Sequence, residues 1–275
     1  MKKITILTDN TSDLTKELYE KNNIEVIKIH AYVGEKVVTD ISETEMFELV
    51  DKIGELPKTA ALNISEFIET FEKYSKDSDV IYCGLGSGFS STYNSAVNAS
   101  KEFDNVYTVD SKNLSSGIGL LLMKMAKMRD EGYSAKEIVE KAEELVSKVR
   151  TSFAINTLHY LHKGGRCSGL ASMLGTMLNL KPIIRVVDNQ LVVTKKPIGF
   201  TKALKFMIDD IVEKADIIDL DHIMITHCLA DEDAEYIREK LSKKFNGDII
   251  LESKASPVIS SHCGPRTIGI LYLMK

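Results

Sequence analysis

The sequence predicts an α/β protein in two parts. We expect an N-terminal domain over residues 1–150, with a parallel sheet covered by helices on both faces, and a smaller α/β domain over residues 151–275, with a mixed sheet. In the first half, short apolar runs rich in strand formers alternate with segments whose apolar residues recur at helical spacing, which is typical of a parallel sheet. In the second half a hairpin pattern and closing strands replace this alternation, which indicates a mixed sheet.

The elements of the first half follow from these patterns. Thr11 or Ser12 is predicted to cap the first helix, at residues 14–21. A capping box of Ser134 and Glu137 is predicted to open the last helix of this half. Strands are expected at residues 4–8, 24–29, 80–83 and 106–109. Helices are expected at residues 14–21, 44–53, 65–74, 93–103, from about 115, and from 134 to about 149.

Parallel strands end at one edge of their sheet, where ligands of such sheets gather. We therefore expect residues 8–10, 86–92 and 110–111 to meet there. The second half is predicted to turn a hairpin at Asp188, Asn189 and Gln190. Its strands are expected at 152–155, 183–187, 191–194, near His222, 249–253 and 267–273, and its helices at 158–163, from 201 and up to 245.

The composition excludes several classes of function. A net charge of -5 and a pI near 5.8 argue against a general binder of nucleic acids or membrane surfaces. Both of these partners are anionic and attract a protein with a broad basic surface, which this composition does not supply. The N-terminus enters a strand-like pattern directly, and no apolar run reaches the length needed to span a membrane, so we expect a cytoplasmic protein.

No metal or cofactor is expected from the cysteines and histidines. The histidine–cysteine pairs at 227–228 and 262–263 could not bind one ion if they lie on strands, because neighbouring side chains then face opposite sides of the sheet. His159 and His162 lack the glutamate of a zinc-binding helix. The cysteines are scattered without a C-x-x-C pair and are expected to be reduced thiols: Cys83, Cys167, Cys228 and Cys263.

The segment from Gly86 to Tyr93 is the strongest candidate for a ligand site. A strand feeds a helix there through glycines and hydroxyls, and the free amides of a helix start favour a phosphate or carboxylate. Ordinary helix capping by serine and threonine explains the same pattern. No lysine follows Gly88 as in a phosphate loop, and Leu85 and Phe89 stand where a hydrolase elbow needs glycines. Phe89 also replaces the third glycine of a dinucleotide fingerprint.

Two later segments combine glycine with a polar side chain. Gly164-Gly165-Arg166 gives an exposed backbone turn with a fixed positive charge, which suits either an anion or a plain helix C-terminal cap. His262 stands just before a Gly264-Pro265 turn, where a buried or turn histidine and a functional one are equally expected.

Together these segments resemble the DegV family of bacterial fatty-acid-binding proteins over essentially the whole chain. The resemblance is carried, in the family's order, by residues 8–14, 58–59, 86–96, 109–111, 161–166, 178–183 and 262–265. It implies a two-domain carrier, not an enzyme, that holds a long-chain fatty acid between its domains and buries its tail there. Carried over by position, the carboxylate ligands are Thr59, Ser90 and His262, with possible support from Arg166, Ser91, Thr92 and Gly264.

The resemblance further implies a partner. Some family members present the acid to a separate fatty acid kinase, which forms an acyl phosphate for phospholipid synthesis. No nucleic acid and no stable membrane insertion are expected, although transient membrane contact is compatible with this role. Tail-lining candidates lie at residues 118–125 and 172–180, where ordinary core packing is the alternative.

The chain departs from the family pattern in three places. Ala60-Ala61-Leu62 replaces a polar segment after Thr59, Ser91 replaces a glycine, and Arg266 stands where a small residue is usual. These changes affect chain selectivity and partner engagement more than carboxylate binding.

Two other functions remain open. The first is an acyl hydrolase or transferase using Ser90 with His262, oriented by Asp9 or Asp110. The second is nucleotide binding on the parallel sheet, which the missing phosphate-loop lysine disfavours.

Overall fold

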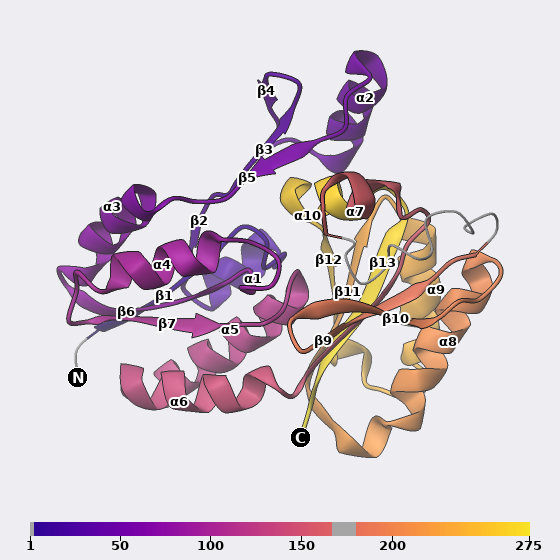
Figure 1. Ribbon diagram of the computed structural model, residues 1–275. Helices are drawn as coiled ribbons and strands as arrows, with labels where there is room; N and C mark the ends of the chain where they lie inside the picture. The colour runs from indigo at the N-terminus through magenta and orange to yellow at the C-terminus, as the bar shows by residue number, and fades with distance from the viewer. Residues whose placement is uncertain (1–2, 167–179) are drawn as a thin grey trace. The chain divides into compact units, whose positions relative to one another are not determined.

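The computed structural model describes residues 3–166 and 180–275 (Figure 1). Cys167 and residues 172–179 of the tail-lining candidates lie outside this part of the chain. The described chain divides into two compact units, of which the first comprises Met1–His30 and Ala60–Val149 and the second Ala31–Thr59 and Arg150–Lys275. The first unit is interrupted, because Ala31–Thr59 groups with the second. With this segment the second unit comprises more residues than the first, although the sequence predicted a smaller one.

The first unit is built on a four-stranded parallel sheet in the order β2-β1-β6-β7, which confirms the predicted fold class. Helices α3 and α4 pack on one face and α5 and α6 on the other (Figure 1). The strands are β1 (Lys3–Asp9), β2 (Ile24–Ile27), β6 (Ser78–Gly84) and β7 (Val106–Asp110). The helices are α1 (Lys16–Lys21), α3 (Ile64–Ser75), α4 (Thr92–Ser100), α5 (Ser116–Asp130) and α6 (Ala135–Val146).

Helix boundaries follow from the caps. The capping box at Ser134 and Glu137 is present as predicted, but α6 ends at Val146 and Val149 already begins the next strand. The predicted cap of α1 is wrong: Thr15 accepts from the N–H of Leu18, and the helix begins at Lys16. Thr11 and Ser12 lie three or more residues before this cap, and their hydroxyls donate to Asp9.

The second unit contains a six-stranded mixed sheet in the order β10-β9-β8-β13-β11-β12. Its hairpin turns at Asp188 and Asn189, which both have positive φ as a tight hairpin requires. The strands are β8 (Val149–Ala154), β9 (Ile183–Val187), β10 (Gln190–Lys195), β11 (Ile218–Cys228), β12 (Ile250–Lys254) and β13 (Thr267–Met274). The helices are α7 (His159–Lys163), α8 (Phe200–Glu213), α9 (Asp231–Leu241) and α10 (Pro257–Cys263), with short 3-10 turns η2 (Ala215–Ile217) and η3 (Gly247–Ile249).

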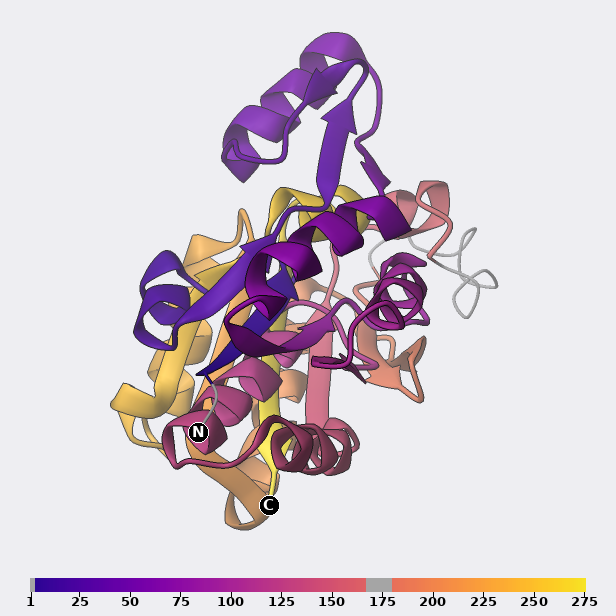
Figure 2. The ribbon, with the colours of Figure 1, turned by 90° about the vertical axis from the view of Figure 1, so that its left-hand side faces the viewer.

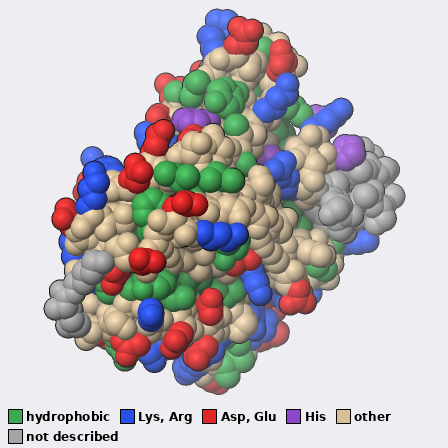
Figure 3. Space-filling view, turned by 60° about the vertical axis from the view of Figure 1, so that its left-hand side comes forward, with side chains coloured by type: hydrophobic (Ala, Val, Ile, Leu, Met, Phe, Trp, Pro, Cys, Tyr) green, Lys and Arg blue, Asp and Glu red, His purple; other side chains and the backbone are tan. Residues whose placement is uncertain are grey.

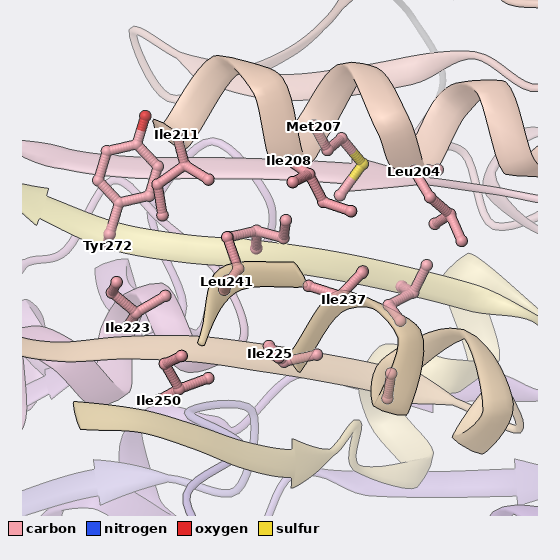
Figure 4. Close-up of a cluster of buried hydrophobic side chains, with 14 of the residues drawn as sticks. Leu204, Met207, Ile208, Ile211, Ile223, Ile225, Ile237, Leu241, Ile250 and Tyr272 are labelled. Carbon is pink, nitrogen blue, oxygen red and sulfur yellow. The ribbon is translucent and has the colours of Figure 1, made fainter. Parts of the chain in front are cut away.

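The core of this unit lies between its sheet and helices α8 and α9. Leu204 and Ile208 of α8 and Ile237 of α9 point toward β11, where Ile223 and Ile225 are fully buried (Figure 4). These side chains are almost entirely aliphatic, so their burial is a main contribution to holding α8 and α9 on the sheet. Ion pairs add to it, between Arg185 of β9 and Asp210 of α8 and between Arg238 of α9 and Glu252 of β12.

The segment Ala31–Thr59 forms a small sheet in the order β4-β3-β5, with helix α2 beside it (Figure 2). Its elements are β3 (His30–Val33), β4 (Lys36–Val37), α2 (Glu43–Ile53) and β5 (Lys58–Ala60). Helix α2 packs on α10, where the Ser261 hydroxyl approaches the Met46 sulfur at 3.8 Å. The packing of α2 on α10 explains why Ala31–Thr59, although it comes from the first half of the sequence, belongs to the second unit.

Candidate functional site

Two of the predicted ligand residues meet in the second unit. Thr59 Oγ1 of β5 and His262 Nε2 of α10 are 2.8 Å apart, although 203 residues separate them in the sequence. His262 lies in the last turn of α10, just before Gly264 ends that helix. Ser256 caps that helix by accepting from the N–H of Ile259, and Pro257 occupies its first turn. The segment Ala31–Thr59 thus ends with the Thr59 hydroxyl in contact with the imidazole of His262.

The imidazole of His262 is mostly buried and neutral. Burial lowers its pKa to about 4, and the positive charge of Arg166 acts in the same direction. A Cβ built on Gly164 would overlap with His262 Nδ1 and lie 3.0 Å from Cε1. The backbone at Gly164 therefore packs directly against the Nδ1 side of the His262 ring. Any residue with a side chain at position 164 would displace the ring.

The tautomer of His262 follows from its partners. Nδ1 is buried and has no hydrogen-bond partner among the described residues, whereas Nε2 faces Thr59. A buried N–H without an acceptor costs more than an unused nitrogen lone pair, so the proton belongs on Nε2. Nε2 then donates to Thr59 Oγ1, and the Thr59 hydroxyl is left to donate its own proton elsewhere.

Gly165 and Arg166 complete the end of helix α7. Gly165 has φ +72°, and the N–H groups of Gly165 and Arg166 donate to the carbonyls of His162 and Leu161. This is a Schellman cap, so the interpretation of the glycines as a helix end is confirmed. The exposed Arg166 donates to the Gly164 carbonyl at 2.6 Å.

An aromatic contact supports the helix that carries His262. Tyr160 of α7 packs edge-to-face on Phe47 of α2, with ring centroids 5.7 Å apart. Gly264 ends α10 with φ +79°, and a Cβ there would overlap with the Tyr160 ring. Gly264 therefore acts through packing, because its missing side chain lets Tyr160 approach the chain next to His262.

Ser90 lies in the first unit, at the start of α4. Its Oγ accepts from the N–H of Thr92 at 3.2 Å and lies 2.9 Å from Thr92 Oγ1. Ser91 is exposed and makes no side-chain capping bond. Its φ of -72° is ordinary helical backbone, so serine in place of the family's glycine causes no strain.

The turn before Ser90 is held by two carboxylates, and the predicted meeting of strand ends is confirmed. Asp9 at the end of β1 accepts from the N–H of Leu85 at 2.8 Å. Asp110 at the end of β7 accepts from the N–H and hydroxyl of Ser87 at 3.1 and 2.6 Å. Both carboxylates serve as scaffolding for the glycine–hydroxyl turn.

The sequence did not reveal how densely Asp9 is bonded. Its fully buried carboxylate also accepts from Tyr82 Oη at 2.7 Å and from the N–H and hydroxyl of Thr11. A Cβ on Gly84 would overlap with both Asp9 Oδ2 and Tyr82 Oη. An aspartate directly after a buried strand was the available signal, but its partners are far away in sequence.

The other two departures from the family pattern also have structural explanations. Ala60 and Ala61 are exposed, and the backbone N–H of buried Leu62 donates to Thr92 Oγ1 at 3.3 Å. Arg266 has φ +57°, pairs with Asp233 at 3.1 Å and stacks on Phe200 at 4.6 Å. Its side chain is therefore engaged within the second unit.

Metal ligands and membrane spans are not found in the described chain. Within residues 3–166 and 180–275, no three histidine, cysteine or acidic side chains form a group suited to a metal ion. In the same residues, no helix combines the length and apolar character that crossing a bilayer requires. On the face drawn in Figure 3, acidic and basic side chains are interspersed.

Comparison with known proteins gives consistent matches over the full length. The profile of the family described as "Uncharacterised protein, DegV family" matches residues 3–275. A DegV domain-containing protein of Staphylococcus aureus is 32% identical over 280 residues, covering all of both chains. Among solved structures, a fatty-acid-binding DegV family protein from Thermus thermophilus has a TM-score of 0.90 at 27% identity. DegV, a fatty acid binding protein from Bacillus subtilis, has a TM-score of 0.90 at 28% identity, and both structures cover all of each chain.

Proposed function

The chain belongs to the DegV family, and from this premise we propose that it binds a long-chain fatty acid whose carboxylate is held by Thr59, Ser90 and His262. The observation that carries the proposal is the 2.8 Å contact between Thr59 Oγ1 and a neutral His262. The fatty acid binding of the Thermus and Bacillus relatives supports the choice of ligand.

The hydrogen-bond chemistry suits a carboxylate. A carboxylate only accepts hydrogen bonds, so a site for it must supply donors. With His262 donating to Thr59, the Thr59 hydroxyl points its own proton away from the ring and is ready to donate to an oxygen of the head group. Arg166, whose charge acts on His262, adds a favourable electrostatic potential for an anion.

The tail supplies most of the binding free energy in this proposal. At about 0.8 kcal/mol per methylene, a C16 chain gains on the order of 12 kcal/mol of gross transfer free energy, and ordering the chain lowers the net value. Residues 118–125 of α5 are almost all buried in the first unit. Their burial favours the core-packing alternative for this segment.

We further propose that the protein is a carrier without catalytic activity of its own. On the family resemblance, it presents the bound acid to a separate kinase in the cytoplasm, and the acyl phosphate enters phospholipid synthesis. Incubation of the purified chain with oleate and ATP should form no acyl phosphate. Formation of acyl phosphate by this chain alone would contradict the carrier role.

The fatty-acid proposal is tested by extracting lipid from gently purified protein and identifying it by mass spectrometry. We expect about one fatty acid per chain, and weaker retention in Ser90→Ala and His262→Ala, because each loses a head-group interaction. Ser100→Ala and His159→Ala are matched controls, since the Ser100 hydroxyl donates to the Val97 carbonyl within α4 and His159 is exposed. No fatty acid in the wild type, with no uptake of added oleate or palmitate, would overturn the proposal.

The Thr59–His262 pair also resembles the nucleophile and base of an acyl hydrolase or transferase, which keeps an enzyme as the second candidate. Two facts weigh against it. A base with a pKa near 4 is weak at neutral pH, and no described side chain orients Nδ1. Asp9 and Asp110 accept hydrogen bonds within the first unit instead. Turnover of acyl esters that is abolished by Ser90→Ala or Thr59→Val would favour the enzyme.

A further inference from the structure

Thr92 connects two parts of the first unit through its side chain. It is fully buried at the first position of α4. Its Oγ1 accepts from the N–H of Leu62 at 3.3 Å and lies 2.9 Å from Ser90 Oγ. Leu62 follows Thr59 by three residues in the chain. The Thr92 hydroxyl therefore bonds both to the segment just after Thr59 and to the glycine–hydroxyl turn that ends at Ser90, called the Ser90 turn below.

The direction of the Ser90–Thr92 bond follows from counting donors. The Leu62 N–H occupies one lone pair of Thr92 Oγ1, and the Thr92 proton needs an acceptor, because no water reaches a fully buried hydroxyl. Ser90 Oγ is the acceptor within hydrogen-bond distance. Thr92 therefore donates to Ser90.

This assignment leaves Ser90 as a donor. Its Oγ accepts twice, from the Thr92 hydroxyl and from the Thr92 N–H at 3.2 Å, and these two bonds occupy both lone pairs. The Ser90 proton then has to point away from Thr92. Since Ser90 is partly exposed, this proton is available to an acceptor outside the turn.

We propose that Thr92 is a positioning residue that fixes Ser90 as a hydrogen-bond donor to the fatty-acid carboxylate without touching the ligand. The inference rests on the proposed function and assigns Thr92 a role different from a carboxylate ligand. It predicts that the Thr92 hydroxyl matters for binding only while Ser90 has a hydroxyl of its own.

The experiment measures oleate affinity by calorimetry for lipid-free wild type, Thr92→Val, Thr92→Ser, Ser90→Ala and the Ser90→Ala/Thr92→Val double variant. We expect Thr92→Val to bind about tenfold more weakly and Thr92→Ser to stay within about twofold of the wild type, because serine keeps the hydroxyl. The double variant should bind as Ser90→Ala alone does, since Thr92 acts through Ser90.

Three results would overturn the inference: unchanged affinity in Thr92→Val, failure of Thr92→Ser to restore affinity, or a full additional loss in the double variant, which would show an independent structural role. If Thr92→Val does not fold, Thr92→Cys replaces it, because a thiol fits the buried site and is only a weak donor. Absence of oleate binding by the wild type would instead refute the proposed function, so the two failures are distinguishable.

Discussion

The Ser90 turn and the Thr59–His262 pair each present a hydroxyl that accepts a hydrogen bond from a neighbouring side chain, but they are held in place differently. Thr92 is the donor to Ser90, and His262 is the donor to Thr59. The turn is fixed by hydrogen bonds from side chains at the ends of neighbouring strands, Asp9 and Asp110. The pair is fixed by shape, since Gly164 leaves room for the imidazole and Gly264 leaves room for Tyr160.

This difference determines which substitutions damage each region. A hydrogen-bonded frame in a buried setting fails when a partner is lost, because the remaining polar groups stay unsatisfied and the fold loses stability. A frame made by close packing fails when volume is added, and the displaced side chain loses its function before the fold is lost. Stability measurements should therefore report mainly on the first region and binding measurements on the second.

The largest effect is expected for Gly84→Ala in the first unit. The added Cβ overlaps with Asp9 Oδ2 and Tyr82 Oη, so it breaks a buried hydrogen bond and forces the strand end apart. We expect a loss of about 3 kcal/mol or more in the free energy of unfolding, measured with urea. Gly247→Ala is the control, because its Cβ would have only one neighbour, Ser242 Oγ at 3.9 Å. Equal stability of the two variants would show that the Asp9 cluster is not the frame of the turn.

The sequence was sufficient for the fold of the first unit, because alternating strands and helices bury regular apolar faces. The capping box at Ser134 and the hairpin at Asp188 were equally readable, since both depend on neighbouring residues. The small sheet of Ala31–Thr59 was missed, because strands of two to four residues such as Lys36–Val37 are too short to show a pattern.

The site could be predicted only in part for a related reason. Residue types and family resemblance pointed to Thr59, Ser90 and His262, but their partners depend on contacts between distant segments. Gly164 lies against His262, 98 positions later in the chain, and Leu62 donates to Thr92, 30 positions later. No local sequence pattern indicates contacts over such separations. The sequence analysis named the Gly264-Pro265 turn but no helix before it, because α10 has only seven residues and is too short to show a periodic pattern.

The second effect concerns pH and the buried ring of His262. Its pKa is about 4 in the folded protein and 6.5 in the unfolded chain, so the unfolded state takes up the proton first on acidification. The stability contributed by the neutral ring is complete above pH 6.5 and is lost as the pH falls toward 4, by at most about 3 kcal/mol.

This linkage is measured by urea unfolding at pH 7 and pH 4.5. The wild type should lose more stability than His262→Gln between these values, whereas the exposed control His159→Gln should behave like the wild type. The same loss in all three proteins would mean that His262 is not buried as a neutral ring, and the packed region would then need another explanation.

The third effect is on binding and concerns Gly164→Ala. The backbone at Gly164 has φ -75°, which alanine adopts without strain, so the cost falls on the imidazole that the Cβ displaces. We expect the unfolding free energy to fall by about 1–3 kcal/mol, less than for Gly84→Ala, and oleate affinity to fall about tenfold. Loss of the Thr59 contact should also move the ring-nitrogen shifts of His262 in NMR spectra. A variant with wild-type affinity and shifts would refute the packing account of this region.

The smallest effect is expected for Ser91→Gly, which restores the glycine usual in the family. Ser91 is exposed, makes no capping bond and has φ -72°, so neither the hydroxyl nor a glycine's freedom is used there. We expect oleate affinity within about twofold of the wild type and a stability loss below about 1 kcal/mol from the greater freedom of the unfolded chain. A large loss of affinity would make Ser91 a head-group ligand. It would also show that the turn binds through more than the hydroxyl of Ser90, and the contrast between a hydrogen-bonded and a packed region would have to be redrawn.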